Sequence, residues 1–196
     1  MTDLEGTDAY AILVIAGGRS VRFGADKLAI LLDRVLESLP ERATVVCVGP
    51  RRPVARADVR WTVESPPLSG PLAAVAAGVA ALQVAGDASP ATVVLVGGDM
   101  PSVGRAVPAL VAAIGRADGA VLLDEESRPQ PLASAWRVSA LSTQLARIGD
   151  PAGRPLRHLL LGTSFVTIPD RWAAARDIDR PDDLRAGPGG STYASD

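Results

Sequence analysis

The sequence predicts a three-layer α/β/α sandwich with a mostly parallel sheet, and three observations support this. Short apolar runs rich in β-branched residues alternate along the chain with longer stretches whose apolar residues recur at helical spacing. The apolar runs are continuous rather than alternating, as expected for strands that are covered on both faces. The chain has 196 residues, 47% hydrophobic and 21% charged, so a single domain can bury a sizeable core.

The individual elements follow from these patterns. Buried strands are predicted at residues 11–15, 44–48, 92–96 and 120–123. Helices are predicted between them, at residues 28–39, 71–85 and 103–116. Weaker patterns predict two further strands, at residues 60–63 and 132–136. Strands that alternate with helices in this way favour a parallel sheet with helices on both faces.

We expect one domain at residues 1–186 and a disordered tail at residues 187–196. The tail reads G-P-G-G-S-T-Y-A-S-D and has too little apolar surface to join a packed core. The single cysteine, Cys47, lies in an apolar run and is expected to be a small buried hydrophobe. The sequence gives no sign of an obligate assembly, and we expect a monomer or a weak homo-oligomer.

Charge and hydropathy exclude several classes of partner. The net charge is −2, so no global positive field favours nucleic acid or an anionic membrane. The N-terminus is acidic where a signal peptide would be basic, and the apolar run at residues 9–16 is too short to cross a bilayer. We therefore expect a cytoplasmic protein without a membrane segment.

The most informative motif is the run I-A-G-G-R-S-V-R-F-G-A-D-K, which begins at Ile15, where the first predicted strand ends. It closes at Lys27, the only lysine among 20 basic residues. A compact ammonium suits a phosphate oxygen in a tight cleft, whereas guanidinium suits bidentate pairing. Glycines at the carboxyl end of a parallel strand let backbone N–H groups approach an anion closely. The run therefore predicts a phosphate-binding site, although it matches neither the P-loop nor the dinucleotide fingerprint.

This run resembles the signature of the molybdenum cofactor guanylyltransferases and related nucleotidyltransferases, approximately L-A-G-G-x-S-x-R-M-G-x-D-K. The resemblance implies a Rossmann-like nucleotidyltransferase fold. It also implies nucleotide-binding residues in the run, with Arg22 and Lys27 on the phosphates; the others are Ile15, Ala16, Gly17 and Gly18. The double glycine is similar to the guanylyl-transferring branch, since cytidylyl-transferring relatives more often carry A-A-G.

A second segment, V-E-S-P-P-L-S-G-P-L from Val63, is similar to the family's acidic residue followed by G-P-L. The resemblance implies that Glu64 contacts the base and that Gly70, Pro71 and Leu72 open a helix toward the nucleotide. One carboxylate can accept both the N1–H and the N2–H of guanine, which makes an acid suitable there. The alternative is that Glu64 only solvates the end of a strand.

A third segment, V-V-L-V-G-G-D-M-P, ends in a D-M-P sequence that resembles the family's metal-binding strand end. The resemblance implies that Asp99 holds Mg²⁺ together with the phosphates, and Mg²⁺ commonly takes one or two carboxylates plus substrate oxygens. The alternative is a helix cap or turn residue. The segment D-I-D-R-P-D-D-L from Asp177 is similar to the family's N-x-N-T-P-E-D-L segment, and either Asp177 or Asp179 is a candidate second metal contact. The alternative is that Asp179 or Asp182 helps to start a helix.

Two arginines, Arg51 and Arg52, follow the second predicted strand, and their position allows two interpretations. They either grip the acceptor's phosphate or belong to a solvated turn. The segment P-Q-P-L-A-S-A-W from Pro129 is similar to the family region that faces the acceptor.

These resemblances imply a Mg²⁺-dependent nucleotidyltransferase that joins GMP from GTP to molybdopterin cofactor and releases pyrophosphate. Arg22, Lys27 and Asp99 are its predicted catalytic residues. One alternative is a cytidylyltransferase or another small-molecule nucleotidyltransferase of the same fold. Another is a degenerate nucleotide-binding regulatory subunit, because the G-x-P turn that usually follows the lysine in the family is missing after Lys27.

Overall fold

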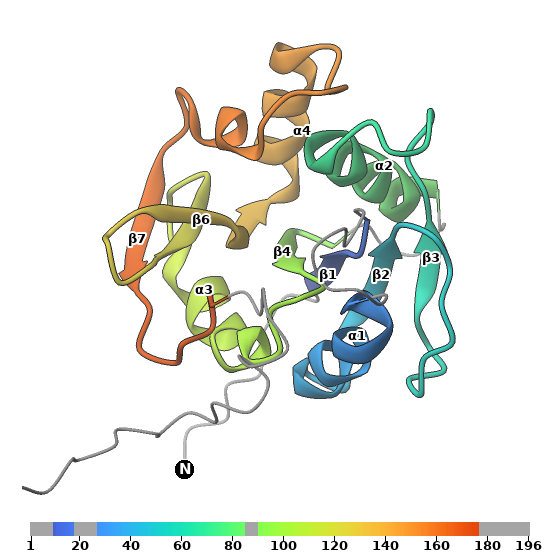
Figure 1. The fold of residues 1–196 in the computed structure, drawn as a ribbon. Coiled ribbons are helices and arrows are strands. Elements are labelled where there is room, and N and C mark those ends of the chain that lie inside the picture. The colour runs from blue at the N-terminus through green and yellow to red at the C-terminus, as the bar shows by residue number, and fades with distance from the viewer. Residues whose placement is uncertain (1–9, 18–26, 85–89, 177–196) are drawn as a thin grey trace, which may run out of the picture.

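The computed structural model describes residues 10–17, 27–84 and 90–176, which form a seven-stranded sheet with helices on both faces (Figure 1). The strands are β1 (Tyr10–Ile15), β2 (Thr44–Val48), β3 (Arg60–Thr62), β4 (Thr92–Gly97), β5 (Gly119–Leu123), β6 (Pro129–Arg137) and β7 (Phe165–Pro169). The α-helices are α1 (Lys27–Ser38), α2 (Pro71–Val84), α3 (Val107–Ala113) and α4 (Val138–Ile148). Two short 3₁₀ helices, η1 (Val103–Arg105) and η2 (Leu156–Leu160), complete the set.

The sheet is mixed but mostly parallel. Its strand order is β3-β2-β1-β4-β6-β5-β7. Strands β1 to β4 are parallel to one another, and β5 is parallel to β7, whereas β6 runs antiparallel to both β4 and β5. The carboxyl ends of β1, β2 and β4 therefore meet at one edge of the sheet, where ligands of open α/β sheets bind.

The core consists of two apolar clusters, one on each face of the sheet. Alternate residues of β1 contribute to each, because successive side chains of a strand point to opposite faces. Ile12 and Val14 pack with α1 and α3 in one cluster, and Leu13 and Ile15 pack with α2 and α4 in the other. This arrangement confirms the predicted three-layer sandwich. The predicted tail at residues 187–196 lies outside the described residues.

The four main strands and the first two helices lie within one residue of their predicted bounds, but the single helix predicted at residues 103–116 is wrong. The chain forms η1, then turns at Ala106 into the shorter α3. Pro108 lacks an N–H and fits only in the first turn of α3, which prevents one continuous helix. Gly104 also packs so closely on α1 that a Cβ would overlap the Ser38 carbonyl.

Helix α4 and strand β7 are absent from the sequence prediction, and β6 is longer than predicted. Within the described ranges, no helix combines the length and the apolar character needed to span a bilayer.

Candidate functional site

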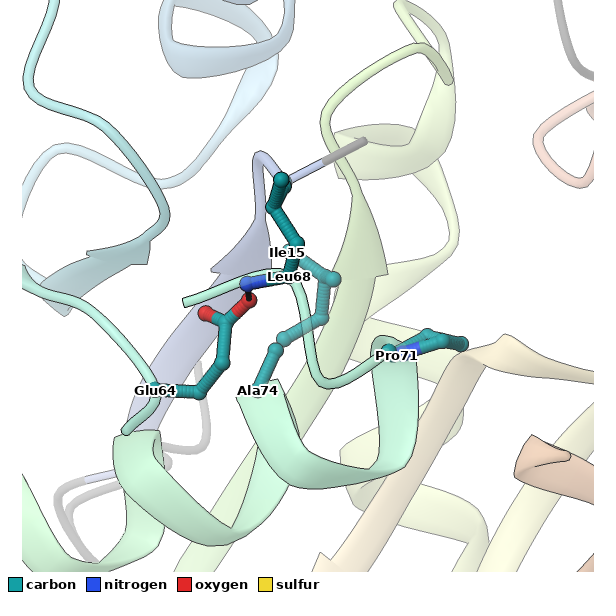
Figure 2. A pocket seen from close by; sticks show the side chains of 7 residues that line it. Ile15, Glu64, Leu68, Pro71 and Ala74 are labelled. Atoms are coloured by element: carbon teal, nitrogen blue, oxygen red, sulfur yellow. Dashed lines mark hydrogen bonds between the residues drawn. The ribbon is translucent and has the colours of Figure 1, made fainter. Parts of the chain in front are cut away.

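A pocket of about 580 Å³ opens where β1 ends and α2 begins (Figure 2). Its lining consists of Ile15, Gly17, Glu64, Leu68, Gly70, Pro71 and Ala74. All of these except Leu68 and Ala74 are predicted nucleotide-binding residues. The fold thus brings the start of the glycine run together with the acidic segment and the helix that follows it.

Glu64 is the buried polar group of this pocket, with only 5% of its surface exposed. Its Oε1 accepts a hydrogen bond of 2.9 Å from the backbone N–H of Leu68, which Figure 2 shows as a dashed line. Its Oε2 is buried and has no hydrogen-bond partner among the residues that the structure describes. Leaving a buried carboxylate oxygen without a donor is costly, so this oxygen marks a place for a ligand's N–H groups.

Sequence reasoning missed Leu68 and Ala74. Leu68 has a φ of 66°, which is uncommon for a residue other than glycine, and this conformation accompanies its N–H bond to Glu64. The prolines, serines and glycine around Leu68 indicate a turn, and this pattern could have placed Leu68 in a loop beside the pocket. Ala74 lies three residues after Pro71 on α2, and helical spacing alone places it on the same side.

The N-terminus of α2 supplies backbone polarity to the pocket. Gly70 has a φ of 101° and precedes Pro71, the first residue of the helix. The first-turn N–H groups of a helix lack intrahelical partners, and the helix dipole favours electron-rich atoms there. The side chain of Leu72 is fully buried in the core and does not line the pocket, so a nucleotide contact from Leu72 rests on its backbone.

The end of β1 is held by backbone hydrogen bonds to β2 and to the residue after β4, and two glycines pack closely against it. The N–H of Ala16 donates to Val48 O at 2.9 Å, and the N–H of Gly98 donates to Ile15 O at 3.0 Å. A Cβ on Gly49 would lie 2.7 Å from the Ala16 carbonyl carbon, and one on Gly98 would lie 3.3 Å from Ala16 Cα. Ala16 itself is buried and lies outside the pocket lining.

Asp99 follows β4 at the same edge of the sheet, directly after the glycine that bonds to Ile15. It is half-buried and does not line the pocket. Across the described ranges, no group of three or more His, Cys, Asp or Glu side chains could enclose a metal ion. A single carboxylate suits Mg²⁺ that shares its remaining ligands with substrate oxygens and water.

The comparisons with known proteins decide the family. Residues 12–163 match the MobA-like NTP transferase domain. The chain is also 30% identical to a probable molybdenum cofactor guanylyltransferase of Chloroflexus aggregans, over 88% of this chain and 90% of that protein. The chain belongs to the MobA-like NTP transferase family. The resemblance predicted from the glycine run is confirmed.

Solved structures share the fold of this MobA-like domain. The molybdopterin-guanine dinucleotide biosynthesis protein A of Archaeoglobus fulgidus superposes with a TM-score of 0.58 at 20% identity, covering 89% of this chain and 95% of that one. The 2-C-methyl-D-erythritol 4-phosphate cytidylyltransferase of Thermus thermophilus superposes with a TM-score of 0.57 at 19% identity, covering 88% and 94%. At such identities the likeness establishes the fold alone.

Several predicted site residues of this MobA-like domain lie outside the described residues. These are Gly18, Arg22, Asp177 and Asp179. Lys27 is the first residue of α1, and the description stops at its backbone.

Arg52 is half-buried and bonded to backbone carbonyls, so it does not belong to a fully solvated turn, while a grip on the acceptor's phosphate stays a prediction. Its Nη1 donates to the Ala16 carbonyl at 3.0 Å and to the Pro50 carbonyl at 3.1 Å. Its neighbour Arg51 is exposed. Cys47 is fully buried, as predicted, and burial raises the pKa of its thiol to about 12 despite the nearby Arg56 and Arg52 guanidinium groups.

Proposed function

We propose that this MobA-like domain transfers GMP from GTP to the terminal phosphate of molybdopterin cofactor and releases pyrophosphate. The observation that carries the proposal is the buried Oε2 of Glu64, which no described residue satisfies, in a side chain that lines the pocket at the carboxyl end of β1. The name of the Chloroflexus relative supports the same reaction.

The pocket chemistry favours guanine. Guanine presents N1–H and N2–H side by side, and the Glu64 carboxylate has two free lone pairs on Oε2 and one remaining on Oε1. Cytosine offers one amino donor next to the N3 acceptor, and a carboxylate would repel the N3 lone pair. The apolar atoms of Ile15, Leu68 and Ala74 supply walls for the faces of a flat ring.

The triphosphate would extend from the base toward the glycine run. We assign Gly17 and Gly18 as backbone donors to the phosphates, and Arg22 and Lys27 as the cations that neutralise them. Gly17 lines the pocket. The Arg22 guanidinium and the Lys27 ammonium would stabilise the negative charge that develops on the departing pyrophosphate.

Asp99 would hold Mg²⁺ beside the phosphates, since it stands at the end of β4 next to the end of β1. When bound, the ion would act as a Lewis acid that offsets the charge of the phosphates. The acceptor is a phosphate that is already ionised at neutral pH, so no general base is needed. The chain's own contribution is then to place the acceptor and GTP in line and to stabilise charge. We further propose a cytoplasmic location and a monomer or weak homo-oligomer.

Pyrophosphate release by the purified protein tests this function. The assay contains Mg²⁺ and one of GTP, CTP, ATP or UTP, with and without molybdopterin cofactor. We expect release with GTP, and only when the acceptor is present. Preference for CTP contradicts the guanylyl assignment. GTP binding without pyrophosphate release, in the presence of acceptor and Mg²⁺, identifies a regulatory subunit instead.

A further inference from the structure

The hydrogen-bond ladder between β1 and β2 has a gap where the glycine run leaves the sheet. In this parallel pair Ile15 lies opposite Val48, and the N–H of Ala16 continues the ladder by donating to Val48 O. The same geometry would satisfy the Ala16 carbonyl with the N–H of Pro50, two residues beyond Val48. Proline has no N–H, so the ladder cannot supply this donor.

Arg52 fills the gap. Its Nη1 lies 3.0 Å from the Ala16 carbonyl oxygen and 3.1 Å from the Pro50 carbonyl oxygen. A guanidinium donor makes a stronger hydrogen bond than the neutral amide it replaces. The side chain is half-buried, whereas that of the adjacent Arg51 is exposed.

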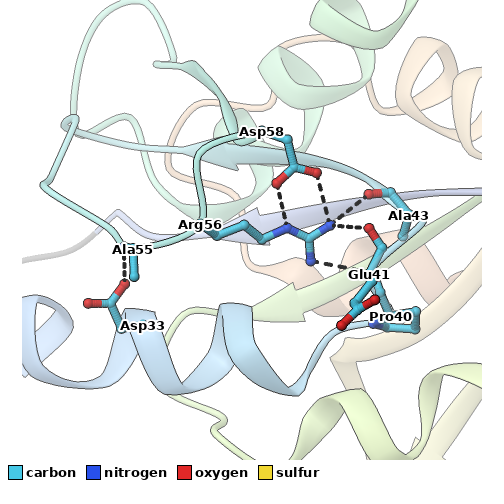
Figure 3. Close-up of polar contacts among 7 residues, drawn as sticks. All are labelled: Asp33, Pro40, Glu41, Ala43, Ala55, Arg56 and Asp58. Carbon is cyan, nitrogen blue, oxygen red and sulfur yellow. Dashed lines mark hydrogen bonds and ion pairs between the residues drawn. The ribbon is translucent and has the colours of Figure 1, made fainter.

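The loop that carries Arg52 is tied to α1 (Figure 3). The N–H of Ala55 donates to Asp33 Oδ1 at 2.9 Å. Arg56 pairs with Asp58 at 2.8 Å and donates to the Glu41 carbonyl at 3.0 Å. Further Arg56 bonds reach the carbonyls of Pro40 and Ala43. The Ala55 bond holds the segment between β2 and β3 against α1, and the Arg56 bonds hold it against the loop that follows α1, so the backbone near Arg52 is fixed in place.

The Ala16 carbonyl matters because it shares a planar peptide with the N–H of Gly17. In a trans peptide the C=O and N–H bonds point in opposite directions, so fixing one fixes the other. Gly17 lines the pocket, and its N–H is the next backbone donor after that of Ala16, which the ladder with β2 uses. The close approach of Gly49 to Ala16 leaves this peptide little space to rotate.

We propose that Arg52 is a positioning residue for nucleotide binding, which orients the Ala16–Gly17 peptide by replacing the donor that Pro50 lacks. The inference rests on the proposed function, because it assumes that a nucleotide occupies the pocket. Arg52 acts through the backbone and does not itself contact the nucleotide.

The test compares Arg52→Ala with Arg51→Ala, the neighbouring arginine as a matched control. We expect Arg52→Ala to raise the KM for GTP about tenfold, the effect of one lost charge-assisted hydrogen bond, with kcat changed less than about threefold. Arg51→Ala should leave the KM within about twofold of wild type. Millimolar guanidinium chloride should lower the KM for GTP of Arg52→Ala toward the wild-type value and leave that of Arg51→Ala unchanged. Arg52→Lys, which keeps the charge but not the planar fork, should be intermediate.

A double-mutant cycle isolates the role of the missing amide. Pro50→Ala restores a backbone N–H opposite Ala16, so Arg52→Ala should cost less in that background than in wild type. Equal KM values for the Arg51→Ala and Arg52→Ala proteins, or a lower melting temperature with an unchanged KM, overturn the inference while the proposed function stands. A wild-type protein that binds none of the nucleotides overturns both.

Discussion

Two regions of this domain treat their polar side chains in opposite ways. In the pocket beside β1, Glu64 has one oxygen with a donor and a second that no described residue pairs with. At the turn between β5 and β6, Asp124 uses both oxygens. It accepts from the N–H groups of Glu126 and Arg128 at 2.9 Å, from Arg128 Nε at 3.0 Å and from Gln130 Nε2 at 2.7 Å.

Gln144 on α4 resembles Asp124, because its side-chain oxygen and nitrogen both have hydrogen-bond partners. It is as buried as Glu64, with 3% exposed, yet its Nε2 donates to the carbonyls of His158 and Leu161 at 2.8 and 2.9 Å. Its Oε1 accepts from Arg147 at 3.4 Å. Asp124 and Gln144 are saturated, because an unmatched buried polar group lowers stability. The Ser142 hydroxyl on α4 also has no partner among the described residues, but it is neutral, and burying an unpaired charge costs far more. The unpaired carboxylate oxygen of Glu64 therefore indicates a ligand site.

The largest effect is expected from the proposed charges that surround the phosphates. Lys27→Ala and Asp99→Ala should each abolish turnover, since losing one such electrostatic contact costs about 10²–10³ in rate. The melting temperature should stay near that of wild type. Pyrophosphate release and thermal unfolding measure the two quantities, with Glu37→Ala on the exposed face of α1 as the control. Near-normal product formation by either variant would remove its role assignment.

Glu64→Gln tests whether the unpaired carboxylate oxygen of Glu64 binds the ligand. The substitution keeps an acceptor for the Leu68 N–H but removes the charge, and it places an amide where guanine's donors would bind. We expect the KM for GTP to rise about 10-fold to 100-fold, as for a lost hydrogen bond to a charged group. The free energy of unfolding should not fall, because an uncompensated buried charge is removed. An unchanged KM with a lower melting temperature would make Glu64 a structural residue.

The part of the site that the sequence predicted is the part that local patterns encode. The glycine run, the acidic residue before G-P-L and the strand that precedes Asp99 are contiguous motifs, and the parallel strands carry them to one edge. The unmatched oxygen of Glu64 could not be predicted, since it depends on which backbone groups the folded loop places nearby. The contact of Arg52 with Ala16 joins residues from two strands' ends and follows only once their register is known.

The missed elements have similar causes. Helix α4 contains Ser139, Ser142 and Thr143, residues that are weak helix formers, and packing against α2 and β6 compensates for them. Strand β7 lies at the edge of the sheet and, among the described strands, pairs with β5 alone. All of its residues are therefore at least partly exposed, and it lacks a continuous buried pattern.

Gln144→Leu tests whether a buried polar side chain whose groups are all paired serves stability and not ligand binding. The change leaves the His158 and Leu161 carbonyls without their donor, which should lower the free energy of unfolding by about 2–4 kcal/mol. The melting temperature should fall by roughly 5–10 °C, while kcat and the KM for GTP stay unchanged. Thr143→Ala, at an exposed position of the same helix, is the control. A KM change in Gln144→Leu equal to that of Glu64→Gln would erase the distinction between the two regions.

The smallest effect concerns the pH dependence of stability at Asp124. Backbone hydrogen bonds, first that from Arg128, together with the Arg128 side chain hold the pKa of the Asp124 carboxyl below its ordinary value of 3.8. A depressed pKa in the folded state contributes stability above pH 3.8, and that stability is lost as the pH falls through the lowered value.

Asp124→Asn removes this titration, so wild type should melt at a higher temperature than the variant near neutral pH, and the two curves should converge below pH 3.8. Melting temperatures measured in steps of pH check this. If melting temperature against pH gave parallel curves for wild type and variant, the four donors around Asp124 would not favour its charged form. The number of hydrogen-bond donors would then no longer distinguish Asp124 from Glu64.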